Sequence, residues 1–111
     1  MEFNNVKPIF LQICDYFYEQ ILSGQISPEQ RIPSVREEAA DIGVNPNTVM
    51  RAYEKMTLEG IIYNKRGIGY FTADNAKDLV LEKEREYFLE KEVPQIKQKL
   101  SLLGLNYTIF E

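Results

Sequence analysis

The stretch IPSVREEAADIGVNPNTVMRAYEKM, residues 32–56, has the pattern of two short helices joined by a tight turn. Ser34 can accept a hydrogen bond from the amide three residues later, where a glutamate can reach back to it, as in a capping box. Gly43 permits a tight turn after the first helix. Asn45 and Pro46 then supply a cap and a first helical residue for the second helix. The stretch therefore predicts a helix-turn-helix.

The second helix of this pair has one apolar side and one polar side. The apolar stripe consists of Val49, Ala52, Tyr53 and Met56. Gly60 is expected to end the helix. The polar side can face either water or DNA, and the helix alone does not distinguish the two.

The flanking segments extend the pair to a winged helix-turn-helix. Residues 8–24 carry isoleucine and phenylalanine at helical spacing, with Pro8 suited to the start and Gly24 to the end of a helix. Residues 61–72, IIYNKRGIGYFT, have the composition of a β-hairpin whose turn contains two glycines. A helix before the pair and a hairpin after it are the parts that make a helix-turn-helix winged.

The last third of the chain predicts a helical extension. A charged helix is expected over residues 76–92, and Pro94 is expected to bend or restart it before Gly104. The predicted fold class is mainly α with a small β-hairpin (α+β). It consists of a winged helix-turn-helix over residues 1–73 and a short helical dimerisation extension over residues 74–111.

Composition excludes several classes of protein. The chain has 111 residues with 44% hydrophobic content, which suits one small packed domain. It contains no histidine, the usual metal ligand and general base, so no metal, cofactor or catalytic centre is expected. The single cysteine, Cys14, falls in an apolar helical pattern and is expected to be an inert core thiol. Without a membrane-spanning run or a signal peptide, the protein is expected to be cytoplasmic.

The net charge of −4 argues mildly against a nucleic-acid partner, but the charge is unevenly distributed. Residues 1–30 carry one basic against four acidic residues, and residues 73–111 carry six against eight. Residues 31–72 carry six basic against five acidic residues, so only this middle segment is not acidic. The overall charge is therefore weak evidence about the partner.

The ordered motifs of the chain resemble the N-terminal winged helix-turn-helix of the GntR family of bacterial transcription regulators. The resemblance covers about residues 8–72, through IPSVRE, NTVMRAYEKM, EG and RGIGYF in that order. The tail of about forty residues is too short for the large effector-binding or aminotransferase-like domain common in that family. It is similar to the small YtrA-type branch, whose extension serves mainly for dimerisation. The resemblance implies a repressor, commonly of transporter operons.

The resemblance assigns DNA contacts to Asn47 and Thr48 in the first turn of the second helix. Thr48, Arg51 and Lys55 form a row at helical spacing that is expected to face the major groove. An arginine in such a row can bond a guanine edge or a phosphate. The alternative is a solvated face on which the basic residues pair with nearby glutamates. Many relatives have arginine where this chain has Pro46, so the resemblance does not carry over the operator sequence.

The remaining DNA-binding candidates lie before and at the start of the first helix of the pair, and in the hairpin. They are Arg31, Ser34, Arg36, Lys65, Arg66 and Gly69. By resemblance, the helix start contacts phosphates and the hairpin enters the minor groove. Ser34 can also serve as a cap alone, Arg31 can form a surface ion pair, and Gly69 can serve the turn alone. Basic residues at an exposed tip can also aid solubility only.

The helical extension carries an apolar row that is too extensive for a small tail to bury alone. The row consists of Leu79, Val80, Tyr87, Val93, Ile96, Leu100 and Leu103. We interpret it as the seam of a homodimer. Packing back onto the first helix of the chain is the alternative.

Together these features predict a homodimeric, sequence-specific DNA-binding transcription regulator with a palindromic operator. Its expected partners are double-stranded DNA, a second copy of the chain and an unidentified small-molecule effector, with no membrane partner. A winged-helix module that binds proteins is the alternative, since the fold also serves that purpose. An enzyme is not expected, because the sequence offers no nucleophile–base pair.

Overall fold

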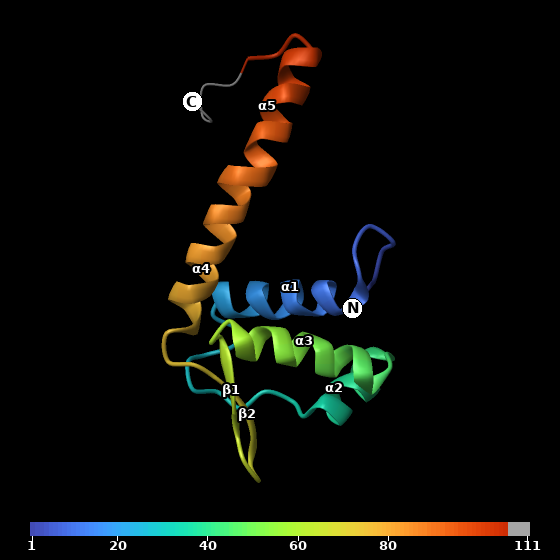
Figure 1. Cartoon of the computed structure of the whole chain (residues 1–111), viewed down its shortest axis with the longest axis vertical. Helices are drawn as coiled ribbons and strands as arrows, with labels where there is room; N and C mark the ends of the chain where they lie inside the picture. Colours follow the sequence, from blue (N-terminus) through green and yellow to red (C-terminus); the bar gives the residue numbers. More distant parts are fainter. Residues whose placement is uncertain (107–111) are drawn as a thin grey trace. The chain divides into compact units, whose positions relative to one another are not determined.

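The computed structural model describes residues 1–106 as five α-helices, one π-helical turn and one two-stranded antiparallel hairpin (Figure 1). In chain order the elements are α1 (Ile9–Leu22), α2 (Val35–Ile42), α3 (Pro46–Leu58), β1 (Ile62–Lys65), β2 (Gly69–Thr72), α4 (Ala76–Tyr87), η1 (Phe88–Glu92) and α5 (Val93–Leu102). This order confirms the predicted fold class. Within the part described, no helix is long and apolar enough to cross a bilayer.

The chain forms two compact units, one spanning Met1–Val80 and a second that begins at Leu81. The first unit contains α1, α2, α3, the hairpin and the start of α4, where Ala76 and Val80 are buried. The second unit contains the rest of α4, η1 and α5. The division of function at residues 73 and 74 stays a prediction.

Local capping shapes the helix-turn-helix as the sequence predicts. Ser34 Oγ accepts from the N–H of Glu37 at 3.1 Å, and Glu37 Oε1 accepts from the N–H of Ser34 at 3.0 Å, which completes the capping box. These bonds hold the pKa of the Glu37 carboxyl below its usual value. Gly43 follows α2 with a φ of 69°, in the left-handed region that favours glycine. The side chain of Asn45 caps α3 by accepting from the N–H of Asn47 at 2.8 Å.

The core of the first unit centres on Tyr53 of α3. Its fully buried ring makes edge-to-face contacts with Phe17 of α1 and Tyr70 of β2, with ring centroids 5.7 and 5.0 Å apart. Its hydroxyl donates to the carbonyl of Pro33 at 2.7 Å, directly before α2. Burial raises the pKa of Tyr53 far above its usual value, so the hydroxyl keeps the proton that it donates. One side chain therefore joins α1, α3, the hairpin and the start of α2.

Cys14 of α1 is a buried free thiol, as the sequence predicts. Its sulfur donates to the carbonyl of Ala52 at 3.5 Å. Burial raises the pKa of the Cys14 thiol to about 11, so it stays protonated and unreactive near neutral pH.

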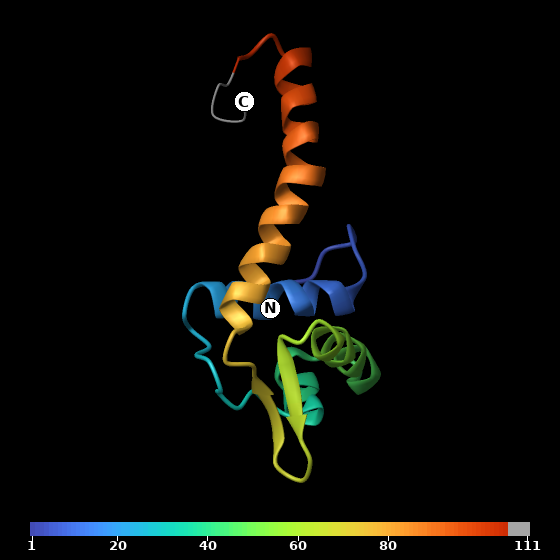
Figure 2. The same cartoon turned by 60° about the vertical axis from the view of Figure 1, so that its left-hand side comes forward.

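The hairpin is anchored to the segment that precedes α2. β1 and β2 pair antiparallel, with Lys65 opposite Gly69 beside the turn. Arg31, in the connector between α1 and α2, forms an isolated β-bridge with Phe71 of β2. Figures 1 and 2 place α2 and the hairpin on the side of α3 away from α1. The first unit thus presents α2, one side of α3 and the hairpin together.

The helical extension differs from the prediction at residues 88–92. The sequence predicts a regular helix up to residue 92, but α4 ends at Tyr87 and a π-helical turn follows. In this turn the N–H of Val93 donates to the carbonyl of Phe88, five residues earlier. Pro94 accounts for the change, because it has no N–H to donate and its ring clashes with a carbonyl of the preceding helical turn. The wider turn accommodates the proline, and α5 continues from Val93.

Ser34→Ala is expected to lower the free energy of unfolding by about 1 kcal/mol, because the N–H of Glu37 loses its cap. Ser23→Ala is the matched control, since the Ser23 hydroxyl donates only to a carbonyl at the exposed end of α1 among the bonds described. We expect the control to change stability by less than about 0.5 kcal/mol. Urea unfolding followed by circular dichroism measures both variants. Equal losses would show that the capping box does not stabilise the fold.

Tyr53→Phe keeps the ring contacts of the core and removes only the hydroxyl that bonds Pro33. We expect a loss of about 1 kcal/mol in the free energy of unfolding, because a carbonyl at the start of α2 loses its donor. Tyr16→Phe is the control, since the Tyr16 side chain is 39% exposed. Denaturant unfolding of the two variants beside the wild type measures the difference. A Tyr53→Phe protein as stable as the Tyr16→Phe protein would contradict the assigned bond.

Candidate nucleic-acid interface

Burial along α3 separates a core side from an outward side. The core side confirms the predicted apolar stripe of Val49, Ala52, Tyr53 and Met56, all buried. The outward side includes the exposed residues Asn47, Met50, Glu54 and Leu58, which recur at intervals of three or four. We call these four residues the outward row. Pro46, Arg51 and Thr57 of α3 are also exposed.

The row predicted from the sequence to face DNA lies beside the outward row. Thr48, Arg51 and Lys55 each follow a member of the outward row by one residue, so they are turned by roughly 100° around the helix. This rotation brings them to the flank of α3 that contacts α1. A contact of these residues with DNA therefore depends on the direction in which each side chain extends from that flank.

Arg51 rests on an aromatic ring of α1. Its guanidinium carbon lies 4.1 Å from the centroid of the Phe10 ring, which is a cation–π contact. The residue remains exposed, so one face of the guanidinium contacts the ring while its edges can still reach a partner. Arg51 is thus held in place at the flank of α3, and its predicted DNA contact stays a prediction.

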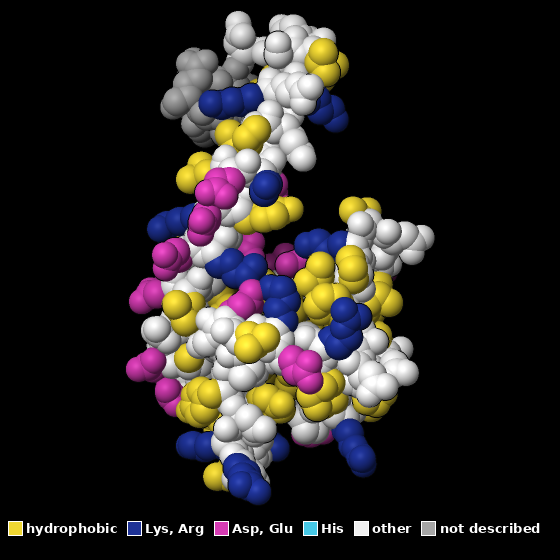
Figure 3. Space-filling view, in the orientation of Figure 1, with side chains coloured by type: hydrophobic (Ala, Val, Ile, Leu, Met, Phe, Trp, Pro, Cys, Tyr) yellow, Lys and Arg dark blue, Asp and Glu magenta, His cyan; other side chains and the backbone are white. Residues whose placement is uncertain are grey.

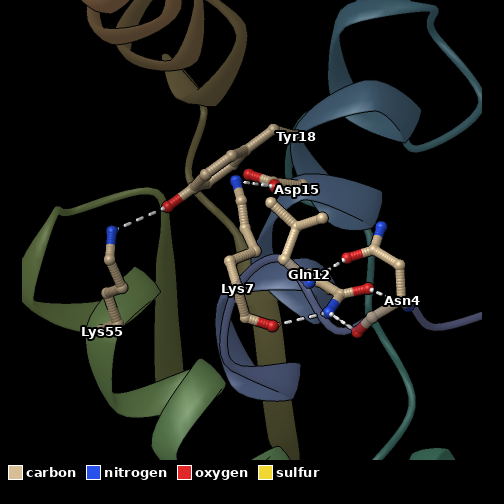
Figure 4. A network of polar contacts seen from close by, with 7 residues as sticks. Asn4, Lys7, Gln12, Asp15, Tyr18 and Lys55 are labelled. Carbon is tan, nitrogen blue, oxygen red and sulfur yellow. Dashed lines mark hydrogen bonds and ion pairs between the residues drawn. The ribbon is translucent and has the colours of Figure 1, made fainter.

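Lys55 is engaged by neighbouring side chains (Figure 4). Its Nζ lies 2.5 Å from a carboxylate oxygen of Glu59 and donates to the hydroxyl of Tyr18 in α1 at 3.3 Å. The Tyr18 hydroxyl in turn donates to the Glu59 carboxylate. Lys55 therefore forms an ion pair with a nearby glutamate, which was the alternative that the sequence left open to a DNA contact. Its contribution to DNA binding stays a prediction.

Of the outward row, the sequence prediction named only Asn47 and missed Met50, Glu54 and Leu58. Met50 is 37% exposed and Leu58 is 89% exposed, although both are apolar. The sequence contained a signal, because Met50 directly follows Val49 of the apolar stripe and therefore points away from it. An apolar side chain on the exposed side of such a helix indicates a contact outside the chain's own core.

The candidates around α2 lie on the same side of α3 as the hairpin (Figures 1 and 2). Ser34 caps α2, and Arg36 is exposed in its first turn. Arg31 lies across the hairpin: its Nε donates to the carbonyl of Ile68 at 3.3 Å. The guanidinium lies against Gly69, where an added Cβ would stand 2.9 Å from Arg31 Nε. Gly69 therefore serves the seating of Arg31 as well as the turn.

The hairpin tip carries the basic residues that the sequence predicts there. Lys65, Arg66 and Ile68 are exposed. Lys and Arg side chains lie beside hydrophobic surface at this end of the first unit (Figure 3). Lys65 Nζ lies 4.8 Å from the centroid of the Phe71 ring, so its stem runs along the hairpin. The tip thus combines positive charge with one exposed branched apolar side chain, Ile68.

The residues of the predicted dimer seam have different environments. Val80 is fully buried in the core of the first unit, and Leu79 packs partly against that core. In the second unit Val93 is buried, whereas Tyr87 and Leu103 are 53% and 62% exposed. Ile96 and Leu100 are half-buried.

Several exposed apolar residues of the second unit were missed by the sequence prediction. They are Leu89, Leu102 and Leu105. Of these, Leu89 lies within the π-helical turn, where regular helical spacing does not hold. We call the set Tyr87, Leu89, Leu102, Leu103 and Leu105 the exposed apolar set.

Comparisons with known proteins agree with this architecture. The family model described as "Bacterial regulatory proteins, gntR family" matches residues 11–71. The chain is 38% identical over 99 residues to the uncharacterized HTH-type transcriptional regulator YhcF of Bacillus subtilis (strain 168), covering 87% of this chain and 82% of that protein. It is 44% identical over 75 residues to the HTH-type transcriptional repressor YtrA of the same strain, covering 68% of this chain and 58% of that protein.

Solved structures give the same result. A GntR family transcriptional regulator from Listeria monocytogenes matches with a TM-score of 0.79 and 32% identity, covering 94% of this chain and 90% of that chain. The structure of AraR(DBD) in complex with operator ORR3 matches with a TM-score of 0.59 and 27% identity, covering 66% of this chain and 88% of that chain. The chain therefore belongs to the GntR family of bacterial regulatory proteins, in its YtrA-type branch, and is a DNA-binding transcription regulator rather than an enzyme.

Proposed function

We propose that this regulator is a homodimeric repressor that binds a palindromic DNA operator. The observation that carries the proposal is the exposed outward row of α3, together with the placement of α2 and the basic hairpin on the side of α3 away from α1. The similarity to AraR(DBD), solved with an operator, supports DNA as the ligand of this side. The resemblance to the YtrA-type branch suggests a transporter operon as the target and the cytoplasm as the compartment.

The outward row would read bases in the major groove. The amide of Asn47 can bond the edge of an adenine with both its donor and its acceptor, and the Met50 side chain can contact a thymine methyl group. Thr48, half-buried in the same first turn, can add a hydroxyl contact. Arg51 lies on the flank, where its guanidinium edge can bond a phosphate while its face stays on Phe10.

Phosphate contacts would supply most of the affinity. The N-terminus of α2 presents backbone amides beside Ser34 and Arg36, and such a helix start favours an anion. Arg31, Lys65 and Arg66 extend the positive charge along the connector and the hairpin. These contacts carry little sequence information, so they would fix the position of α3 rather than choose the operator.

The second unit would supply the dimer contact. The exposed apolar set consists of five large side chains that are in contact with water, and the second unit has few other residues that could bury them. A second copy related by a two-fold axis would cover the same residues on both chains at once. Two copies would also present two recognition helices, which a palindromic operator requires. A small-molecule effector stays a prediction without an assigned site.

Asn47→Ala and Met50→Ala are expected to weaken binding to the preferred duplex by about tenfold to a hundredfold, with little change for a random duplex. Arg36→Ala should weaken both duplexes alike and lower the slope of log affinity against log salt by about one, because it removes a phosphate contact. Selection from random duplexes by the full chain supplies the preferred sequence, and fluorescence anisotropy at several salt concentrations supplies the affinities.

Lys77→Ala is the control for this experiment, since Lys77 is an exposed base in α4, away from the proposed contacts. It should leave both affinities and the salt slope within about twofold of the wild type. Binding that is insensitive to salt and to sequence would refute DNA recognition by this surface. It would support the protein-interaction module instead.

Leu103→Glu is expected to weaken the dimer at least tenfold, because it places a charge in the proposed apolar contact. Gln95→Glu is the matched control, since it adds the same charge at an exposed polar position of α5. Sedimentation equilibrium of the two variants and the wild type measures the association. A wild type that is monomeric, or a Leu103→Glu protein that associates like the control, would overturn the assignment of the seam.

A further inference from the structure

Ile68 is an apolar side chain at the tip of the hairpin with no role in the fold. It is 58% exposed and lies outside the hydrophobic core cluster and outside the residues packed against it. Its neighbours in the turn are Lys65, Arg66, Gly67 and Gly69. Because a branched apolar side chain in water at such a tip contributes little to folding, Ile68 is available for an external contact.

The backbone of Ile68 is held on both sides. Its N–H donates to the carbonyl of Lys65 at 2.9 Å, and its carbonyl accepts from Arg31 Nε at 3.3 Å. The glycines on either side, Gly67 and Gly69, have φ of 79° and 142°, which lets the chain turn sharply there. Because a β-branched side chain also has few rotamers, Ile68 is presented in a nearly fixed direction. A contact made by such a side chain loses little conformational entropy.

Arg31 can hold Ile68 only because residue 69 is glycine. An added Cβ at Gly69 would stand 2.9 Å from Arg31 Nε and 3.4 Å from its second terminal nitrogen, closer than real Cβ contacts allow or tolerate easily. Gly67 also has a positive φ, of 79° against 142° at Gly69, but an added Cβ there meets nothing within 4 Å. Of these two glycines, only Gly69 leaves room that the Arg31 side chain needs, whereas the absence of a Cβ at Gly67 affects the backbone of the turn alone.

The chemistry around Ile68 suits duplex DNA better than a protein. Arg31, Lys65 and Arg66 surround it with positive charge, which matches phosphates on both sides of a groove. One isoleucine is far too small for a protein interface, which needs on the order of 1,000 Å² of buried surface. In the minor groove, by contrast, a single apolar side chain can wedge between two base pairs and kink the duplex.

We propose that Ile68 is an apolar wedge of the hairpin in the minor groove of the operator, and that Arg31, seated on Gly69, is its positioning residue. The proposal rests on the proposed function, since it requires that the chain bind DNA. At the position of the wedge, the operator is expected to carry a pyrimidine–purine step, because these steps unstack most easily. It therefore adds sequence preference at a position that the recognition helix does not reach.

The test compares Ile68→Ser with Ile68→Val in the full chain on the duplex selected by the wild type. Ile68→Ser should lose about tenfold in affinity and reduce the bend of the duplex, measured by energy transfer between dyes at its two ends. Its salt slope should stay that of the wild type, because no phosphate contact is lost. Ile68→Val keeps a branched apolar side chain and should bind and bend within about twofold of the wild type.

The two glycines provide an independent arm of the same test. Gly69→Ala should resemble Ile68→Ser in affinity and bend, because it displaces Arg31 from the Ile68 carbonyl. Gly67→Ala is the control for a side chain added at a positive φ in the same turn without a contact to Arg31, and it should stay close to the wild type in bend. Unfolding curves of all four variants verify that the hairpin change does not unfold the protein.

The outcomes separate this proposal from the function on which it rests. An Ile68→Ser protein that binds and bends the selected duplex like the wild type overturns the wedge and leaves DNA recognition intact. A loss of affinity accompanied by a lower salt slope also overturns it, since the change would then act through phosphates. A wild type that selects no sequence at all overturns both the wedge and the proposed function.

Discussion

The burial of Tyr53 is a constraint on which the arrangement of the candidate nucleic-acid interface depends. Its ring joins α1 through Phe17 and the hairpin through Tyr70, and its hydroxyl bonds the carbonyl of Pro33 immediately before α2. Because Tyr53 belongs to α3, this one side chain links α3 to both α2 and the hairpin, beside the anchoring of the hairpin by Arg31. A shift of the ring would move the Ser34 cap and the hairpin together.

The features that the sequence predicted correctly are those set by local chemistry. The capping box at Ser34, the left-handed Gly43 and the cap at Asn45 each involve residues at most a few positions apart. The apolar stripe of α3 follows equally from helical spacing. These signals were sufficient for the fold class, because most helices of the helix-turn-helix begin or end at residues with clear capping or turn chemistry.

The features that the sequence did not predict depend on contacts between distant segments. Helical spacing shows which side of α3 is buried, but it does not show which flank α1 covers. That flank holds Arg51 on Phe10 and Lys55 on Tyr18, about forty residues away along the chain, and leaves Met50 in the outward row. In the extension, the π-helical turn before Pro94 changes the spacing in a way that a regular helical pattern does not anticipate.

The acidic net charge is compatible with the roles proposed for the basic and the apolar residues of this interface. At physiological salt, charges beyond about 8 Å are largely screened, so the few bases of the proposed interface would act locally while the acidic residues elsewhere would contribute little repulsion. Non-specific binding, which depends on many phosphate contacts, should then be weak. On the proposed interface, discrimination would fall to short-range contacts, and exposed apolar residues such as Met50 and Ile68 are suited to that role because salt does not screen them. A regulator with a low positive charge can thus remain selective by relying on shape and methyl contacts more than on charge.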